Sequence, residues 1–473
     1  MADHSFSSTA THDAPPAAAH ATEPARAVAM PTDRWQAMRR RSRLVDMVII
    51  ALIFITALVT YVSGIEETAF HQDESRWINR AHYLGDLFDP FGPTWNDQYL
   101  TRGQPPVGSY MMGLGLVVQG RDLDTNPAYD FRRTREFNQE FGTIPAYDDL
   151  IAGRRWNSFL GAVSASLVYL IVRRLTNPVG GIAASLFLIA NPLQTWHNRL
   201  ALADTALTLT LALLMLCVIQ LMRRPSWGWA IASGVLIGLG GANKFTPIAL
   251  AAPLALIGAV MLIRAWFDRR SLRADHSPGF LGFPSFRDQG WMLVSIPFTA
   301  LATFVAVYPY LWPDPIRRTL TLIQFRQDEM ANQYRLYPRF RTDTPLDALE
   351  RTVVALGDAW SSTGHFLESI GFTTLADNAS QLDIVLAVTG IVLLLWIGIR
   401  KGLRSAELAI VSLIIFQAAT IVLNMRVDFE RYYLPILLGE VVAIGSVIGI
   451  VTSLAWHAFQ PTSRPDQSRA VTS

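Results

Sequence analysis

A series of long apolar runs, separated by short basic segments, is the feature that most constrains how this chain folds. A helix needs about 20 predominantly apolar residues to cross a bilayer, because no water inside it satisfies backbone polar groups. The third and fifth runs are short for a span. The sequence predicts an all-α polytopic membrane protein with about ten transmembrane helices. The runs are Met47–Val62, Trp156–Val172, Val179–Pro192, Ala206–Met222, Trp227–Ala242, Phe245–Trp266, Trp291–Trp312, Ile384–Ile399, Leu408–Leu423 and Tyr432–Trp456.

The distribution of charge predicts the orientation of these runs. Only 16% of the residues are charged, whereas a soluble domain carries about a quarter. With the N-terminus inside, each short inner loop holds a basic cluster, as membrane topology requires. Both termini are then cytoplasmic, and the chain is expected in the plasma membrane with its long hydrophilic segments, 66–155 and 313–383, outside. The clusters are Arg173 with Arg174, Arg223 with Arg224, Arg264 with Arg269 and Arg270, and Arg400 with Lys401 and Arg404.

Composition divides the chain into five regions. Residues 1–38 and 457–473 have the polar, non-periodic composition of disordered tails. Residues 39–312 form the expected catalytic transmembrane module, which includes outer loop 66–155. An outer soluble segment, 313–383, and C-terminal transmembrane helices, 384–456, complete the chain. The first run follows an arginine cluster without a convincing cleavage site, which favours an uncleaved signal anchor, and the single cysteine, Cys217, excludes an intrachain disulfide.

The first outer loop contains an apolar stretch, Val107–Gln119, that is too short to cross the membrane. If it crossed, every later loop would change sides and the charge pattern would fail. We expect an interfacial helix whose Met and Leu side chains face lipid. The polar insert Arg121–Ala152 follows it.

Ionisable residues gather at the outer ends of the spans. Together they offer carboxylates for proton abstraction and cations for a phosphate, beside lipid. Chemistry on a lipid-linked phosphate needs that combination. They are Asp73 and Glu74 next to His71, then His197, Arg199 and Asp204, then Lys244, and finally Arg426, Asp428, Glu430 and Arg431.

Each of these positions also has a structural interpretation. The Asp73–Glu74 pair can cap the following helix, Arg199 and Asp204 can form an ion pair, and Lys244 can extend from a helix end to water. Glu440 lies inside the last run among Leu, Gly and Val, and a buried carboxylate there is expected to have a partner or to serve as a proton or ion site.

The order of the motifs resembles the protein O-mannosyltransferase family and its bacterial relatives among the GT-C membrane glycosyltransferases. Five motifs lie in the family's order within the first six spans, and a sixth echoes a late motif of the wider group. They are the Asp73–Glu74 pair, Gln104–Ser109 (similar to His-Pro-Pro-Leu-Gly-Lys), Arg155–Gly161 (Arg-x-x-Ser-x-x-Gly), Arg199–Asp204 (Arg-Ile-x-x-x-Asp), Gly238–Thr246 (Gly-Leu-Ala-x-x-x-Lys-Trp-Thr) and Arg431–Pro435.

This resemblance implies a GT-C fold and inverting transfer of a monosaccharide, with mannose expected, from a polyprenyl-phosphate carrier to an acceptor hydroxyl at the outer face. Asp73 would be the general base and Glu74 would orient the acceptor or the donor. Arg199 and Lys244 would hold the departing phosphate. The expected supporting residues are Asp204, His71, Arg155 and Arg431.

Two departures from the family motifs concern the acceptor. Gln104 stands where the family usually has His, and Ser109 where Lys is frequent. The expected acceptor is a protein or a lipid, and no nucleic acid partner is expected. No metal site is predicted, and a divalent cation as cofactor is left open. Trp77 and Trp95 are candidates for stacking against a sugar ring.

Three other functions are compatible with the sequence. A transporter or flippase of a lipid-linked or anionic substrate would use Glu440, although transporters usually place binding residues near the midplane of repeated halves. An aminoarabinose-type lipid glycosyltransferase would share the scaffold with a different sugar and acceptor. A catalytically inactive relative would not need Asp73, Arg199 and Lys244.

Overall fold

The computed structural model describes residues 32–271 and 285–459. The chain divides into two units, residues 1–48 and 49–473. In the first unit, helix α1 (Thr32–Val62) begins inside the segment predicted as a tail. The remainder of that segment, the end of the C-terminal tail from residue 460, and residues 272–284 lie outside the described residues.

The described part of the chain is helical, with one isolated β-bridge between Arg341 and Val427. Eight of its helices are long and apolar enough to cross a membrane. Two of the shorter apolar helices, α8 (Pro178–Ala190) and α11 (Trp227–Gly241), are the third and fifth runs. The predicted all-α polytopic class is therefore confirmed. The eight are α1, α7 (Tyr147–Leu175), α10 (Asp204–Arg223), α12 (Ala251–Ser271), α13 (Phe286–Ala306), α18 (Leu382–Lys401), α19 (Ala406–Asn424) and α20 (Leu434–Phe459).

Caps and prolines explain where helix ends differ from the predicted runs. Helix α13 starts earlier than predicted because Ser285 and Asp288 form a capping box. It ends at Ala306, shortly before Pro309. Helix α7 starts at Tyr147, more than two turns before its apolar run, and thereby carries Arg154 and Arg155.

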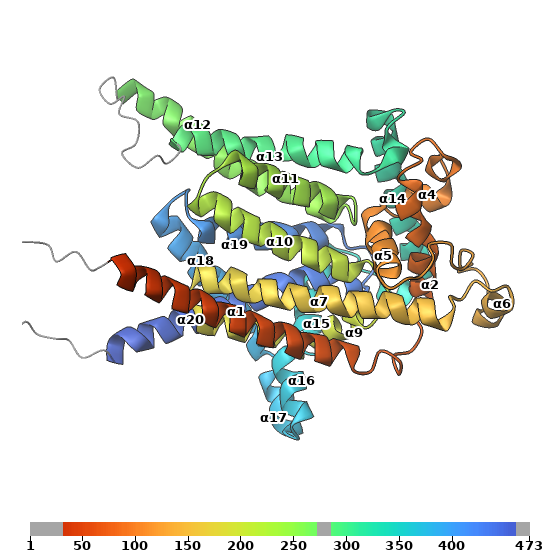
Figure 1. The fold of residues 1–473 in the computed structure, drawn as a ribbon, viewed down its shortest axis with the longest axis horizontal. Coiled ribbons are helices and arrows are strands. Elements are labelled where there is room, and N and C mark those ends of the chain that lie inside the picture. The colour runs from red at the N-terminus through yellow and green to blue at the C-terminus, as the bar shows by residue number, and fades with distance from the viewer. Residues whose placement is uncertain (1–31, 272–284, 460–473) are drawn as a thin grey trace, which may run out of the picture. The chain divides into compact units, whose positions relative to one another are not determined.

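Short helices occupy one end of the long ones within the second unit. Figure 1 shows α2, α4, α5, α6 and α14 at the same end of α7, α10 and α13, whereas α16 and α17 project to the side. We call this end the Asp73 end. The remaining helices are α2 (Gln72–Asn79), α3 (Tyr83–Asp86), α4 (Tyr99–Gly103), α5 (Val107–Val117), α6 (Arg135–Glu140), α9 (Pro192–Asn198), α14 (Pro315–Leu336), α15 (Pro345–Gly357), α16 (Ser362–Ser369) and α17 (Thr373–Ala379), with 3₁₀ turns Arg80–His82, Pro93–Trp95, Thr246–Leu250, Pro309–Leu311, Pro338–Phe340 and Glu430–Tyr432.

Helix α5 is the short helix predicted at Val107–Gln119, but the expectation for its side chains is wrong in part. Met112 and Leu116 are buried against neighbouring residues that include Trp77 and Ala152. Leu114 alone of these three is exposed, at 40%. Two of the apolar side chains thus pack against α2 and α7, which hold the site, because protein neighbours are available on that face.

Glycines allow the helices under the site to approach closely. A Cβ atom added at Gly445 of α20 would lie 2.5 Å from Ala184 Cβ and 2.6 Å from the Gly180 carbonyl oxygen of α8. A Cβ at Gly390 of α18 would lie 2.2 Å from the Ala443 carbonyl oxygen of α20. Small residues at helix crossings let van der Waals packing hold membrane helices together.

We predict that Gly445→Ala destabilises the protein, because its methyl group forces α8 and α20 apart. Overpacking of this kind costs about 1–3 kcal/mol. Thermal unfolding of the purified protein measures the effect. Gly228→Ala in α11 is the control, since its nearest neighbour outside the helix backbone would be 3.8 Å away. Equal melting temperatures for the two variants would contradict this packing.

Candidate active site

Helix α2 begins with a capping box that fixes the acidic pair. The His71 side chain accepts a hydrogen bond from the Asp73 backbone N–H at 3.2 Å, and the Glu74 carboxylate accepts one from the His71 N–H at 2.9 Å. Both carboxylates lie in the first helical turn, where the helix dipole stabilises negative charge. The capping interpretation of the pair is therefore correct for Glu74, and it leaves the Asp73 side chain free to point elsewhere.

Glu74 is completely buried and forms an ion pair with Arg154 of α7. The two Glu74 oxygens lie 2.8 Å and 2.7 Å from the Arg154 guanidinium nitrogens. Arg154 also donates to the carbonyl oxygens of Ile65, Thr68 and Ala69, and Glu74 accepts from the Ala201 N–H. This network ties four segments together. Glu74 is therefore enclosed by protein and does not line the pocket described next.

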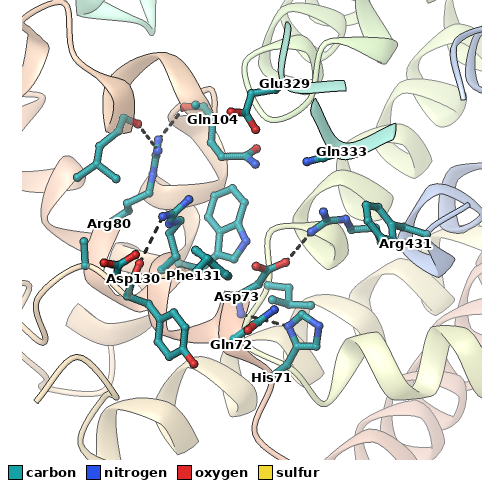
Figure 2. A pocket seen from close by; sticks show the side chains of 18 of the residues that line it. His71, Gln72, Asp73, Arg80, Gln104, Asp130, Phe131, Glu329, Gln333 and Arg431 are labelled. Atoms are coloured by element: carbon teal, nitrogen blue, oxygen red, sulfur yellow. Dashed lines mark hydrogen bonds and ion pairs between the residues drawn. The ribbon is translucent and has the colours of Figure 1, made fainter. Parts of the chain in front are cut away.

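A pocket of about 870 Å³ lies at the Asp73 end. Asp73 lines it and forms an ion pair with Arg431, with 2.6 Å between a carboxylate oxygen and a guanidinium nitrogen (Figure 2). Burial alone lowers the pKa of Arg431, but Asp73, Tyr432 and Asp204 raise it overall, so the guanidinium stays charged. A carboxylate and a guanidinium from opposite ends of the chain thus meet in a cavity large enough for a small-molecule substrate.

His197, Asp204 and Lys244 form a polar cluster that interacts electrostatically with Arg431. Lys244 and Asp204 form an ion pair, and Asp204 interacts with both His197 and Arg431. His197 lines the pocket but Asp204 and Lys244 do not. Burial, reinforced by Lys244 and Arg431 against the opposing effect of Asp204, lowers the pKa of His197 to about 4. His197 is therefore neutral at pH 7, with the Nδ1 proton donated to the Leu193 carbonyl oxygen at 3.1 Å.

Two predicted site residues lie elsewhere. Arg199 donates to the Thr60 carbonyl oxygen at 2.9 Å, and its guanidinium packs against Gly64 rather than lining the pocket. Arg155 is exposed on α7, and its neighbour Arg154 makes the contact with Glu74.

Three further candidates have different surroundings. Trp77 lines the pocket, whereas Trp95 is buried against Tyr83 and does not. Glu440 is buried in α20, and its Oε2 atom has no hydrogen-bond partner within the described residues. The pocket therefore includes one of the two predicted stacking residues and excludes the carboxylate considered for transport.

Several pocket residues were not among the predicted site residues. Arg76 lies one turn after Asp73, its guanidinium is 4.3 Å from the centre of the Phe131 ring, and it has no ion pair among the described residues. Residues 128–132 of the polar insert and one face of α14 also line the pocket. The position of Arg76 on the Asp73 face of α2 was readable from helical spacing. The contributions from the insert and α14 depend on tertiary structure alone.

A metal site needs several ligand side chains close together. Among the residues that the structure describes, no group of three His, Cys, Asp or Glu side chains is arranged to hold a metal ion.

Comparison with known proteins identifies the class. Residues 89–308, a little under half of the chain, match the family described as dolichyl-phosphate-mannose-protein mannosyltransferase. This match confirms the resemblance predicted from the motifs, and it supports the predicted glycosyltransferase class and GT-C fold. No curated protein sequence matches the chain.

Three solved membrane proteins resemble the structure at low sequence identity. The Saccharomyces cerevisiae protein O-mannosyltransferase Pmt1-Pmt2 complex, bound to the sugar donor, has 12% identity and a TM-score of 0.39 over 56% of this chain and 33% of that chain. ArnT from Cupriavidus metallidurans, bound to undecaprenyl phosphate, has 14% identity and a TM-score of 0.45 over 86% and 61%. The Archaeoglobus fulgidus oligosaccharyltransferase has 13% identity and a TM-score of 0.46 over 87% and 50%. The chain thus matches between a third and three fifths of these proteins.

We predict that Arg154→Ala strongly destabilises the protein, because Glu74 would remain as a buried, uncompensated charge. Breaking a buried ion pair in this way costs about 3–5 kcal/mol. Thermal or denaturant unfolding measures the loss. Arg155→Ala is the matched control, since its exposed side chain predicts a change within about 0.5 kcal/mol. The reverse order of stabilities would show that Arg155 holds the acidic pair.

The lowered pKa of His197 predicts acid sensitivity. The unfolded chain has the ordinary value of 6.5 and the folded chain about 4, so the unfolded state binds the proton more readily. The stabilisation is therefore complete above pH 6.5 and is lost as pH falls towards 4, by about 2–3 kcal/mol at pH 4.5. Melting temperatures of the wild type and His197→Gln should converge, or cross in favour of the variant, between pH 7.5 and 4.5. A constant difference would contradict a neutral buried imidazole.

Proposed function

We propose that the protein transfers a monosaccharide, with mannose as the expected sugar, from a polyprenyl-phosphate carrier to an acceptor hydroxyl. The transfer proceeds with inversion at the outer face of the plasma membrane, and both termini are cytoplasmic. The observation that carries this proposal is the Asp73–Arg431 pair in the pocket. It combines a candidate base and a cation in one cavity at the ends of apolar helices, and the match to the mannosyltransferase family supports it.

Asp73 is the proposed general base. Its carboxylate lines the pocket, whereas the Glu74 carboxylate already accepts hydrogen bonds from Arg154, the Ala201 N–H and the His71 N–H. A base must be able to come within hydrogen-bond reach of the acceptor hydroxyl, and of the two carboxylates only Asp73 lines the pocket. Glu74 therefore acts as a positioning residue that holds the first turn of α2, and in this way it orients the substrates indirectly.

Arg431 is the proposed first ligand of the donor phosphate. Without substrate, Asp73 and Arg431 neutralise each other. A bound phosphate would pair with the Arg431 guanidinium in place of Asp73. The Asp73 carboxylate could then accept the proton of the attacking hydroxyl. Charge develops on the phosphate as it leaves, so a cation placed beforehand stabilises the transition state. Arg76 lies on the same face of α2 and adds a second cation to the pocket.

The cations predicted from the motifs have more distant roles in this proposal. Lys244 acts through Asp204, which interacts electrostatically with Arg431. Arg199 lies at the end of α1, against Thr60 and Gly64, where it can meet the phosphate of a carrier that approaches along the helices from the lipid. The insert residues 128–132 supply one wall of the pocket, which supports a role for the insert in binding the acceptor.

We expect purified wild-type protein to transfer labelled mannose from polyprenyl-phosphate mannose to a mixed pool of peptide and lipid acceptors, and Asp73→Asn to lose this activity about 10²–10⁴-fold. The asparagine is nearly isosteric but cannot take up the proton. Asp377→Asn, an exposed carboxylate on α17 outside the pocket lining, is the control and should retain full activity. The anomeric configuration of the product, determined by NMR, tests inversion.

Other outcomes would change the proposal in defined ways. Equal transfer by wild type and Asp73→Asn would remove Asp73 as the base. Transfer from another polyprenyl-phosphate sugar, but not from mannose, would keep the mechanism and replace the substrate. Movement of an intact lipid-linked sugar across vesicle membranes, without transfer from any donor, would favour a transporter.

A further inference from the structure

The wall of the pocket formed by α4 and α14 includes, beside Arg326 and Asn332, the polar side chains Gln104, Glu329 and Gln333, which we call the polar wall. Gln104 follows α4 directly, and Glu329 and Gln333 lie one turn apart on α14. Figure 2 shows all three at the pocket, apart from the dashed ion pair of Asp73 and Arg431. Because of their spacing, Glu329 and Gln333 present neighbouring groups from one face of α14.

Aromatic packing holds the two helices of this wall together. The rings of Tyr99 on α4 and Phe325 on α14 are 5.6 Å apart, and the Arg102 guanidinium lies 5.4 Å from the centre of the Phe325 ring. Phe325 is one turn before Glu329 on α14. These contacts hold α4 and α14 together next to the polar wall, whose amide and carboxylate groups face the cavity.

The side chains of the polar wall have no partners within the described residues, in contrast to the charged pair across the pocket. None of them makes a hydrogen bond or ion pair there, and the Oε1 atom of Gln333 is buried without a hydrogen-bond partner. Leaving a buried polar atom unsatisfied costs about 1–3 kcal/mol. The buried Gln333 Oε1 atom, beside two half-buried polar side chains without protein partners, indicates that a ligand completes these hydrogen bonds.

The hydrogen-bonding groups and charges of the polar wall determine which kinds of ligand can bind to it. The two amides each offer a donor and an acceptor, and Glu329 offers acceptors alone. Glu329 repels a phosphate placed directly beside it, and a simple cation is disfavoured because the wall has one acidic group, with Arg326 one turn before it on α14 and Arg102 nearby. Neighbouring hydroxyl groups on a ring match this alternation of donors and acceptors.

We propose that the polar wall binds the hydroxyl groups of a sugar ring and determines which sugar the protein accepts. This inference rests on the proposed function. With the carrier phosphate at Arg431, a ring attached to it would extend into the cavity towards the polar wall. A glycan on the acceptor presents the same chemistry, so the experiment distinguishes the two sources.

Binding measured with full-length protein in lipid nanodiscs tests the inference without requiring turnover. The ligands are short-chain prenyl-phosphate mannose, the prenyl phosphate without sugar, and methyl mannoside as a free glycan. The test variants are Gln333→Leu and Glu329→Gln. Their matched controls are Gln327→Leu and Asp328→Asn, which change exposed residues of α14 outside the pocket lining.

If the donor sugar is the ligand, we expect the wild type and both controls to bind prenyl-phosphate mannose at least about tenfold more tightly than prenyl phosphate. If an acceptor glycan is the ligand, we expect the same proteins to gain binding of methyl mannoside. Gln333→Leu and Glu329→Gln should remove most of this gain and leave the affinity for prenyl phosphate unchanged. A loss with prenyl-phosphate mannose identifies the donor sugar as the ligand. A loss confined to methyl mannoside identifies an acceptor glycan.

Several results would overturn the inference. If the wild type shows no sugar-dependent gain with either ligand, or if the variants keep it, the polar wall does not bind sugar. If the variants lose affinity for prenyl phosphate itself, the wall binds the carrier instead. Failure of transfer in the activity assay, together with sugar-dependent binding here, would reject the proposed reaction and retain the sugar site.

Discussion

The ion pair between Glu74 and Arg154 is the interaction on which the geometry of the site depends. Both groups are buried, so their charges are tolerated only because each hydrogen-bonding position is occupied. Arg154 holds the chain between α1 and α2 through three carbonyl oxygens, and Glu74 holds the backbone at Ala201. The first turn of α2 is consequently fixed against α7, and the direction of Asp73 follows from that.

In this arrangement the adjacent carboxylates of Asp73 and Glu74 have different roles. A helix turns by about 100° per residue, so consecutive side chains point to different faces. Glu74 faces the interior and is saturated by protein donors, whereas Asp73 faces the pocket and has Arg431 as its partner. A single acidic pair thereby supplies both the support of the site and its candidate base.

The fold class and part of the pocket lining were readable from the sequence, because apolar length and the clustering of charge are local properties. The runs predicted the helices, and Asp73, His197 and Arg431 do meet in one pocket. Arg155 was expected from its motif as a supporting residue, whereas its neighbour Arg154 pairs with Glu74, because a motif gives the spacing of residues and not the face of the helix on which each lies. Met112 and Leu116 of α5 were expected at lipid for a similar reason: composition does not show which protein surfaces will cover a helix.

The walls of the pocket could not be predicted because they come from segments without a recognisable motif. The insert and α14 are polar and irregular in sequence, and their positions depend on contacts such as that between Tyr99 and Phe325. Arg199, by contrast, belongs to a recognisable motif but does not line the pocket. Its guanidinium donates a hydrogen bond to the Thr60 carbonyl oxygen, which directs it towards the end of α1.

The distance along the chain between Asp73 and Arg431 has a consequence for biosynthesis. The two residues are 358 positions apart, and Arg431 precedes α20, the last of the described helices. A ribosome therefore makes most of the described helices before the carboxylate of Asp73 can find its partner. A prematurely terminated chain would insert most of these helices and still lack the Asp73–Arg431 pair, so the order of synthesis itself leaves partial products without a finished pocket.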